Sequence, residues 1–507
     1  MYFGATEIAM AWNHEVARER IQKHLNTAPE VDDNITLAEH FDRAKAEIAR
    51  AKAEGRFPGT RAVRVDGAHL YSQLLGFDEL VADGARGETE SSHQKVLRFL
   101  HAHYEIWDAL CEEDEALRVD FHGPRLHAVI VSPANNPRAQ VLRAIALAKK
   151  LEEAAKRVGR VHGFPTAVRS GIDHGTCLAL TTGRAHDTDT LFLGRPANHA
   201  AKLLHADPRE GIYLTPNAQG IAYRRTDPLD EVTKARRWTE ALEEAASTFR
   251  FAKLDAAIER VVSETGTSAG PTFRFFRPPP PLKNTRFKDL MPSRTARMGM
   301  ASLFADVDGY TAFVDNAIAM GGGAIKTAAT GIHVIREELN SVLRDDCGGK
   351  RVRFIGDCIH GLMTKGQEED DPSGAIEDAV VCASAMKSSF DLCLDAVPGL
   401  DTLDLAIGIE YGPVPLTRVG RKGAESIRCA AGKAVIDSER MQQSIEHGGT
   451  RLGPIARSVA AFQVRKHFEK TDRIPEYDDA LNLLGLSSAP VVQILRSEPD
   501  ARSHLKQ

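Results

Sequence analysis

The strongest constraint on the fold is an internal repeat, because segments of the first half of the chain recur in the same order in the second half. RVDFHGPRLHAVI (118–130) corresponds to RVRFIGDCIHGLM (351–363), and RSGIDHGTCLAL (169–180) corresponds to LAIGIEYGPVPL (405–416). RAVRVDGAHL (61–70) is matched to SLFADVDGYT (302–311) through a shared Asp-Gly turn. Such self-similarity predicts one fold built twice, with the copies packed about a pseudo-twofold axis.

Hydrophobic periodicity predicts the same order of elements in both halves. The first half is expected to contain helices at 34–55, 91–111 and 141–158, a strand at 60–67 and a strand pair within 115–132. The second half is expected to contain a strand at 301–307, helices at 311–343 and 375–394, a hairpin at 351–364 and a strand entering 408–412. Helices mixed with hairpins predict an α+β fold.

A proline-rich stretch divides the chain. Pro278 to Pro281 are consecutive prolines, which favour a stiff extended connection and cannot continue a helix or a central strand. We therefore expect a first domain at 1–265, a linker at 266–297 and a second domain at 298–507. Two units of this size can each bury a core, as a chain of 507 residues requires.

Charge and cysteine content narrow the classes of function. Lys and Arg total 65 against 70 Asp and Glu, which gives a net charge of −5 and argues against a protein that coats nucleic acid. The seven cysteines are scattered and never spaced Cys-x-x-Cys, which argues against a disulfide framework. With no basic leader and no long apolar stretch, we expect a cytoplasmic protein without a membrane segment.

Two acids at strand ends point to metal chemistry. Asp306 interrupts an apolar strand, and Asp357 occupies the turn of the hairpin RFIGDCIHG. A buried carboxylate is costly unless a cation neutralises it, and paired carboxylates suit hard divalent cations in phosphoryl transfer. Gly309, Tyr310 and Thr311 open a helix whose first N–H groups could bind phosphate. The alternative for each motif alone is an ordinary turn.

Together the two motifs resemble those of class III nucleotide cyclases, F-x-D-[IV]-x-G-[FY]-T and [KR]-x-x-G-D. The resemblance covers most of 298–445 closely and 58–210 less closely. It implies two tandem cyclase-type domains, each with a βαββαβ ferredoxin-like core, packed as a pseudo-dimer. It also implies two Mn²⁺ or Mg²⁺ ions held by Asp306, Asp357 and the Val307 carbonyl.

The first half departs from this pattern, because Arg64 and Pro124 stand where the second half has its two acids. It nevertheless keeps a later family motif in LFLGRPANHAAKLL, where Asn198 and Lys202 lie one helical turn apart. By resemblance, Asn198 would orient the ribose and Lys202 would stabilise the transition state. The second half has Ile436 and Arg440 at these positions, so a single live composite site is expected. The alternative is that Asn198 and Lys202 are surface polar residues.

The positions that identify the base in purine cyclases are here Asp120 and Leu191, which fit neither adenine nor guanine pairs. Asp120 could accept a hydrogen bond from uracil, cytosine or guanine, so the residues alone leave the base open. Phe121 could stack on the base or belong to the core. Arg418, together with Arg421, Lys422 and Arg428, is a candidate for binding the triphosphate.

The whole chain resembles the pyrimidine cyclases of bacterial anti-phage signalling, which serve a separate cyclic-nucleotide-responsive effector protein. This resemblance favours UTP as substrate and 3′,5′-cyclic UMP and diphosphate as products, made by a monomer. The alternatives are a guanylate or cytidylate cyclase, or a catalytically silent nucleotide sensor.

Overall fold

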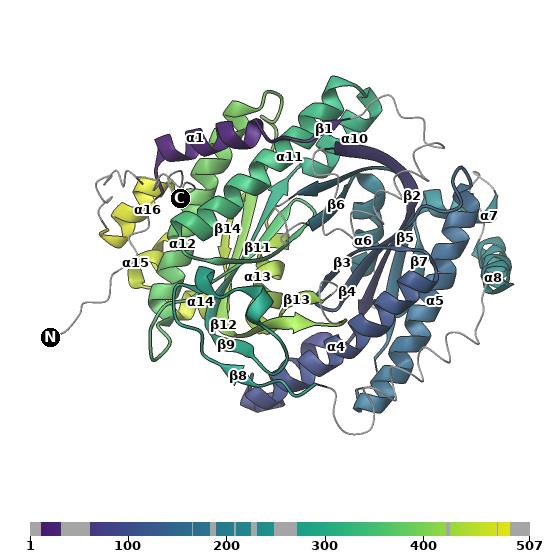
Figure 1. Ribbon diagram of the computed structural model, residues 1–507, viewed down its shortest axis with the longest axis horizontal. Coiled ribbons are helices and arrows are strands. Elements are labelled where there is room, and N and C mark those ends of the chain that lie inside the picture. The colour runs from purple at the N-terminus through teal and green to yellow at the C-terminus, as the bar shows by residue number, and fades with distance from the viewer. Residues whose placement is uncertain are drawn as a thin grey trace, which may run out of the picture.

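The structure is a computed structural model, and it describes residues 12–31, 61–164, 166–182, 189–206, 209–224, 231–247, 271–421, 426–473 and 475–486 (Figure 1). The helix predicted at 34–55 lies outside these residues. The domain division stays a prediction, because 248–270 also lie outside them. Within the predicted linker, residues 275–276 and 295–297 are strand residues of the second sheet.

The first domain combines one sheet with helices. Its strands are β1 (Glu30–Val31), β2 (Arg61–Leu74), β3 (Leu117–His122), β4 (Arg125–Ile130), β5 (Val168–Thr182), β6 (Asp189–Leu193) and β7 (Gly211–Leu214). Its helices are α3 (Phe77–Leu80), α4 (Glu90–Glu113), α5 (Pro137–His162), α6 (Arg195–Ala206), α7 (Pro216–Tyr223) and α8 (Glu231–Ser247).

The second domain repeats this order. Its strands are β8 (Phe275–Phe276), β9 (Thr295–Asp308), β10 (Lys350–Ile355), β11 (Cys358–Met363), β12 (Asp404–Val419), β13 (Ile427–Ala430) and β14 (Gly449–Leu452). Its helices are α10 (Tyr310–Met320), α11 (Gly323–Ser341), α12 (Pro372–Ala396), α13 (Lys433–Gln443), α14 (Pro454–Val459), α15 (Phe462–Phe468) and α16 (Tyr477–Leu484).

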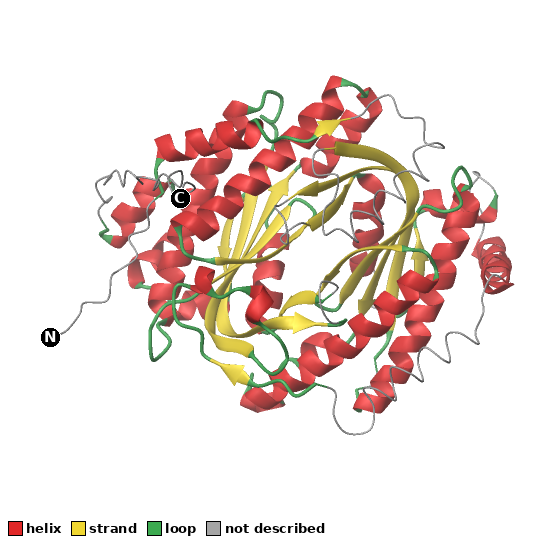
Figure 2. Ribbon diagram, viewed as in Figure 1, coloured by secondary structure: helices red, strands yellow, loops and turns green. Residues whose placement is uncertain are grey.

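The two sheets have the same topology, which confirms the predicted repeat and the α+β class. The first sheet has the order β3-β4-β2-β5-β6 with β7 beside β5, and the second has the order β10-β11-β9-β12-β13 with β14 beside β12. Figure 1 shows the sheets facing each other, with α4 and α5 outside one sheet and α11 and α12 outside the other. Figure 2 shows the same arrangement of strands between helices. The inner faces of the two sheets therefore meet at the interface between the halves.

The register corrects the alignment of the first strand of the repeat. Gly408 lies opposite Phe304 in the second sheet, and Gly171 lies opposite Tyr71 in the first. Gln73, not Arg64, is therefore the counterpart of Asp306. Gly76 and Gly309 precede equivalent helices at φ 75° and 81°, and each lies 47 positions before the hairpin glycine, since 123 − 76 = 356 − 309.

A close approach of helix to strand explains the glycines that begin the GIDHG and GIEYG segments. A Cβ on Gly171 would lie 2.2 Å from the Ala200 carbonyl of α6, and one on Gly408 would lie 2.1 Å from the Ser438 carbonyl of α13. Real carbon and oxygen atoms do not approach this closely. Glycine is therefore required to seat α6 and α13 on their sheets.

The helix predicted at 311–343 is two helices. α10 ends at Met320, α11 begins at Gly323, and Gly321 and Gly322 between them have φ of 71° and 53°. Positive φ interrupts an α-helix and is readily adopted by glycine. The break separates the short helix that follows Asp306 from the long helix that covers the core.

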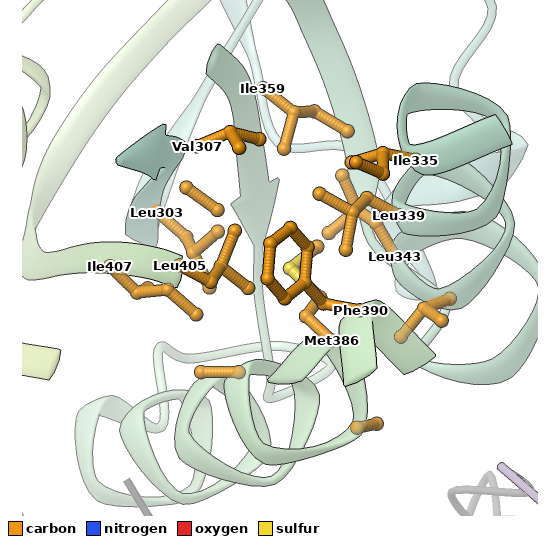
Figure 3. Close-up of a cluster of buried hydrophobic side chains, with 14 of the residues drawn as sticks. Leu303, Val307, Ile335, Leu339, Leu343, Ile359, Met386, Phe390, Leu405 and Ile407 are labelled. Carbon is orange, nitrogen blue, oxygen red and sulfur yellow. The ribbon is translucent and has the colours of Figure 1, made fainter. Parts of the chain in front are cut away.

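The second domain packs α11 and α12 against one face of its sheet. Figure 3 shows Leu303, Val307 and Leu405 of the strands pointing toward Leu339 of α11 and Phe390 of α12. Successive side chains of a strand point to opposite faces. Phe304 and Asp306 therefore point away from this core, toward the first domain.

The helix α1 (His14–Leu25) packs on the second domain, although it precedes the first sheet in sequence. Trp12 Nε1 donates to Ser389 Oγ at 2.7 Å, and Arg20 pairs with Glu338 and Asp346 at 2.6 and 2.7 Å. β1, which follows, pairs with β2 of the first sheet. The described residues near the N-terminus therefore contact both halves. None of the helices in the described ranges has the length and apolar character needed to span a membrane.

Candidate active site

The register brings the two acids together. Ile359 lies opposite Ala305, so Asp357, in the turn just before β11, lies beside the end of β9 that carries Asp306. Both side chains are half-buried. Gln442 of α13 donates from Nε2 to Asp306 Oδ2 at 3.2 Å. The predicted pair is thus assembled at adjacent strand ends on the face turned toward the first domain.

Electrostatics disfavour ionisation of both acids in the absence of a cation. Burial, followed by the neighbouring Asp308, raises the pKa of Asp306 to about 6. Burial, followed by Asp306, raises the pKa of Asp357 well above its usual value. Two carboxylates that repel each other away from bulk water are stabilised by a shared positive charge.

The donor set fits divalent cations that prefer oxygen ligands. Two carboxylates from adjacent strand ends supply the oxygen atoms that Mg²⁺ or Mn²⁺ prefers. Within the described ranges, no three His, Cys, Asp or Glu side chains converge into a closed cage. The protein would therefore contribute Asp306, Asp357 and the Val307 carbonyl, which leaves ligand positions for a triphosphate.

Asn198 of the first domain lies against the helix that follows the strand carrying Asp306. Asn198 Nδ2 donates to Thr311 Oγ1 at 2.8 Å, so α6 of the first domain meets the start of α10 in the second. Gly309, Tyr310 and Thr311 form this start. Tyr310 is buried and donates to the Ala328 carbonyl at 2.5 Å, so its side chain belongs to the core and only its backbone faces the site.

Lys202 and its counterpart Arg440 have different surroundings. Lys202 is exposed on α6 and forms no ion pair with any residue in the described part of the chain. Arg440 donates to Asp78 of the first domain and to Asp437. Asp78 occupies the position equivalent to Thr311. We call the site formed by the equivalent positions, Gln73 and Pro124 of the first domain with Ile436 and Arg440 of the second, the mirror site. Its cation, Arg440, is neutralised by carboxylates, whereas Lys202 is available to an anion.

A cavity of about 60 Å³ lies between the halves. Asp120 and Leu191 of the first domain line it together with Phe354, Ile355 and Gly356 of the second, the last next to Asp357. The two predicted base-reading positions thus share one pocket, on the side where the metal-binding turn lies. Its other lining residues are Tyr71, Val119, His122, Arg125, His127 and Phe192.

Asp120 has a cationic partner that the sequence did not reveal. Arg353 Nη1 lies 3.0 and 3.1 Å from its two carboxylate oxygens. Arg353 comes from the second domain and occupies the repeat position equivalent to Asp120, as RVD and RVR show. Asp120 is 35% exposed at its side chain, so the pair leaves part of the carboxylate open to a ligand.

Two further expectations are corrected. Phe121 is fully buried and stacks on Tyr104 with ring centroids 4.3 Å apart, so it belongs to the core and cannot stack on a base. Arg418 lies twelve positions along β12 from Ala406, the residue opposite Asp306 (418 − 406). At about 3.3 Å per residue this is tens of ångströms of strand, too far for a side chain to bridge. Arg421, another triphosphate candidate, pairs with Asp108 and Glu112.

Sequence reasoning missed an ion cluster between the halves, whose His122 and Arg125 also line the cavity with Asp120 and Leu191. Glu439 of α13 accepts from His122 Nε2 at 3.2 Å and from Arg125. Arg125 and His122 offset the burial of Glu439 and hold its pKa well below the usual value. Arg125 follows Pro124, the counterpart of Asp357. The sequence does show a basic residue, Arg125, in the first half and an acidic residue, Glu439, in the second. Only the arrangement of the two domains shows that these residues pair.

The mirror site therefore cannot form the same metal centre. Gln73 and Pro124 stand at the positions of Asp306 and Asp357, and the permanent cation of Arg125 lies nearby. Two cyclase-type domains therefore face each other, one carrying the paired carboxylates and the other the Asn/Lys pair, which is the arrangement of a nucleotide cyclase.

Comparisons with known proteins also indicate a nucleotide cyclase. The sequence model of the adenylate and guanylate cyclase catalytic domain matches residues 68–226, the half that lacks the two acids. A uridylate cyclase of a Rhizobium species is 39% identical over 90% of this chain and 92% of its own. A uridylate cyclase of Pseudomonas aeruginosa is 33% identical over 98% and 96%.

A solved structure has the same two-domain architecture. It is a class III adenylyl cyclase-like ATP-binding protein from Pseudomonas aeruginosa, with a TM-score of 0.79 and 31% identity over 94% of this chain and 99% of that one. The chain belongs to the class III nucleotide cyclase family. Members of this family generally use divalent metal ions.

Proposed function

We propose that the protein converts UTP to 3′,5′-cyclic UMP and diphosphate. The observation that carries this proposal is the hydrogen bond from Asn198 of the first domain to Thr311, at the start of the helix that follows the strand carrying Asp306. It supports a composite site in which Asp306 and Asp357 act together with Asn198. The base pocket supports a pyrimidine, because Leu191 is apolar and Asp120 supplies an acceptor for an N–H donor. The names of the two full-length relatives support uracil over cytosine.

Each half contributes a separate part of the chemistry. Asn198 would orient the ribose, and Lys202 would stabilise the charge that develops as the 3′-oxygen bonds to the α-phosphorus and diphosphate leaves. The N–H groups at the start of α10 would hold phosphate oxygens. Two Mg²⁺ or Mn²⁺ ions bound by Asp306, Val307 and Asp357 would supply charge neutralisation and activation of the 3′-hydroxyl.

The cellular role extends this proposal by resemblance. In this proposed role, the protein makes its cyclic nucleotide in the cytoplasm during anti-phage defence, and a separate effector protein responds to that nucleotide. The chain itself needs neither nucleic acid nor membrane for this role. A monomer suffices, because both halves of the site are encoded once in the same chain.

A nucleotide panel tests the function. Purified protein incubated separately with UTP, CTP, GTP and ATP in Mn²⁺ is expected to yield cyclic UMP as the main product by mass spectrometry. Specific activity should stay constant over a hundredfold dilution, because the site forms within one chain. A preference for GTP or CTP would contradict UTP as the substrate. Absence of any cyclic product would indicate a nucleotide sensor. A steep loss of specific activity on dilution would show that the site forms between two chains.

A second prediction concerns the base. Asp120→Ala should lower kcat/KM for UTP and reduce discrimination against CTP by about 10- to 100-fold, the effect of one lost hydrogen bond to a charged group. Competition between UTP and CTP on both proteins measures this change. An unchanged preference would show that Asp120 does not read the base.

The Asp120 variant also leaves the Arg353 guanidinium without this carboxylate, so a control must separate the two effects. Asp120→Ala combined with Arg353→Met removes both charges of the ion pair. If Asp120 reads the base, discrimination stays low in the double variant. If the unpaired arginine causes the defect, the double variant regains the wild-type preference.

A further inference from the structure

The start of α6 is held by the other domain. The backbone N–H of Arg195, the first residue of α6, donates to Asp315 Oδ1 at 2.6 Å. Asp315 lies on α10 of the second domain, half-buried, one turn after Thr311. Asn198, in the first turn of α6, donates to Thr311. Two hydrogen bonds therefore tie the first turn of α6 to one face of α10.

This contact is favourable for physical reasons that do not involve substrate. The first N–H groups of a helix lack partners within it, and a carboxylate at that end also interacts favourably with the helix dipole. A charge-assisted hydrogen bond is stronger and more directional than a neutral one. Asp315 thereby restricts the position of α6 relative to the domain that carries Asp306.

The mirror site has an equivalent helix cap but lacks the proposed catalytic side chains. The backbone N–H of Lys433, the first residue of α13, donates at 2.8 Å to Glu88 Oε1 of the first domain. Glu88 is also within 3.0 Å of His93 Nε2. Each domain thus caps the helix of the other, but α13 carries Ile436 in place of Asn198.

We propose that Asp315 is a positioning residue, which fixes α6 at its N-terminus so that Asn198 and Lys202 meet the nucleotide held by the second domain. This inference rests on the proposed function and extends it to a residue that contacts no substrate. Small displacements of catalytic groups reduce rates by large factors, so the loss of this cap should lower kcat more than it weakens nucleotide binding.

The test separates turnover from binding and from stability. Asp315→Ala should lower kcat about 10-fold or more while KM for the nucleotide changes less than about twofold. Asp315→Asn should restore most of kcat, because its amide oxygen still accepts from Arg195. In a background of Asn198→Ala and Lys202→Ala, Asp315→Ala should lower kcat by less than about twofold further.

Glu88→Ala is the matched control. It removes the equivalent cap from α13 and should lower the melting temperature about as much as Asp315→Ala, with kcat unchanged. Equal loss of kcat in the two variants, wild-type kcat in Asp315→Ala, or full additivity in the triple variant would each overturn the inference. Wild-type kcat in Asn198→Ala and Lys202→Ala would overturn the proposed site as well.

Discussion

Replacing Asp306 or Asp357 with Ala is expected to abolish turnover while the protein remains folded. Divalent cations on a triphosphate supply several kcal/mol of transition-state stabilisation, so loss of a carboxylate should cost about 1,000-fold or more in kcat. Product formation with Mn²⁺ measures the loss, and circular dichroism checks the fold. Gln73→Ala, at the equivalent position of the first domain, is the control and should keep nearly full activity. Near-normal kcat in either Asp variant would exclude the two-metal mechanism.

The same acids should destabilise the metal-free protein. Burial raises the pKa of Asp306 to about 6, so its ionised form is disfavoured in the folded state. This penalty is absent at low pH, grows as pH rises toward 6 and is complete above it. Asp306→Asn should therefore raise the melting temperature of the metal-free protein more at pH 8 than at pH 5. Mn²⁺ should stabilise the wild type but not this variant.

The second large effect concerns the asymmetry of the two sites. Asn198→Ala and Lys202→Ala should each lower kcat by about 10- to 1,000-fold, because fixed donors aimed at developing charge act mainly in the transition state. Steady-state kinetics with UTP measure the change. KM should change less than kcat, because in the proposed complex the second domain holds the triphosphate.

Arg440→Ala is the matched control for Lys202→Ala, since both residues occupy the same repeat position. Arg440 is neutralised by Asp78 and Asp437, so its removal should leave kcat near the wild-type value. It should cost at most about 1 kcal/mol of stability, as exposed ion pairs do. A larger loss of kcat in Arg440→Ala than in Lys202→Ala would assign the working site to the opposite face.

Local patterns predicted the paired elements well, because strand and hairpin signals are set by neighbouring residues. The hairpin turns at Gly123 and Gly356 and the glycines at 171 and 408 lie at equivalent places in the two sheets. The first strand was misaligned because Asp66-Gly67 resembles the turn at Gly309 while lying inside β2, whereas the equivalent glycine is Gly76.

The parts of the site that could not be predicted depend on tertiary contacts, either within one domain or between the two. The strand position of Phe121 suits either a pocket or a core, and its stacking on Tyr104 of α4 in the same domain decides for the core. Nothing in the sequence distinguishes Arg353 from other strand arginines, because its partner Asp120 belongs to the other domain. Asp315 lies beyond the motif that begins its helix, and its proposed role depends on α6, which lies beside that helix.

The ion pair between Asp120 and Arg353 makes the interface between the halves asymmetric. These residues occupy the same place in the two halves and touch each other, so in a symmetric assembly of two identical halves each residue would face its own copy. Two aspartates or two arginines there would repel. The pair therefore favours association of the two unlike halves, since either half assembled with a second copy of itself would place like charges in contact.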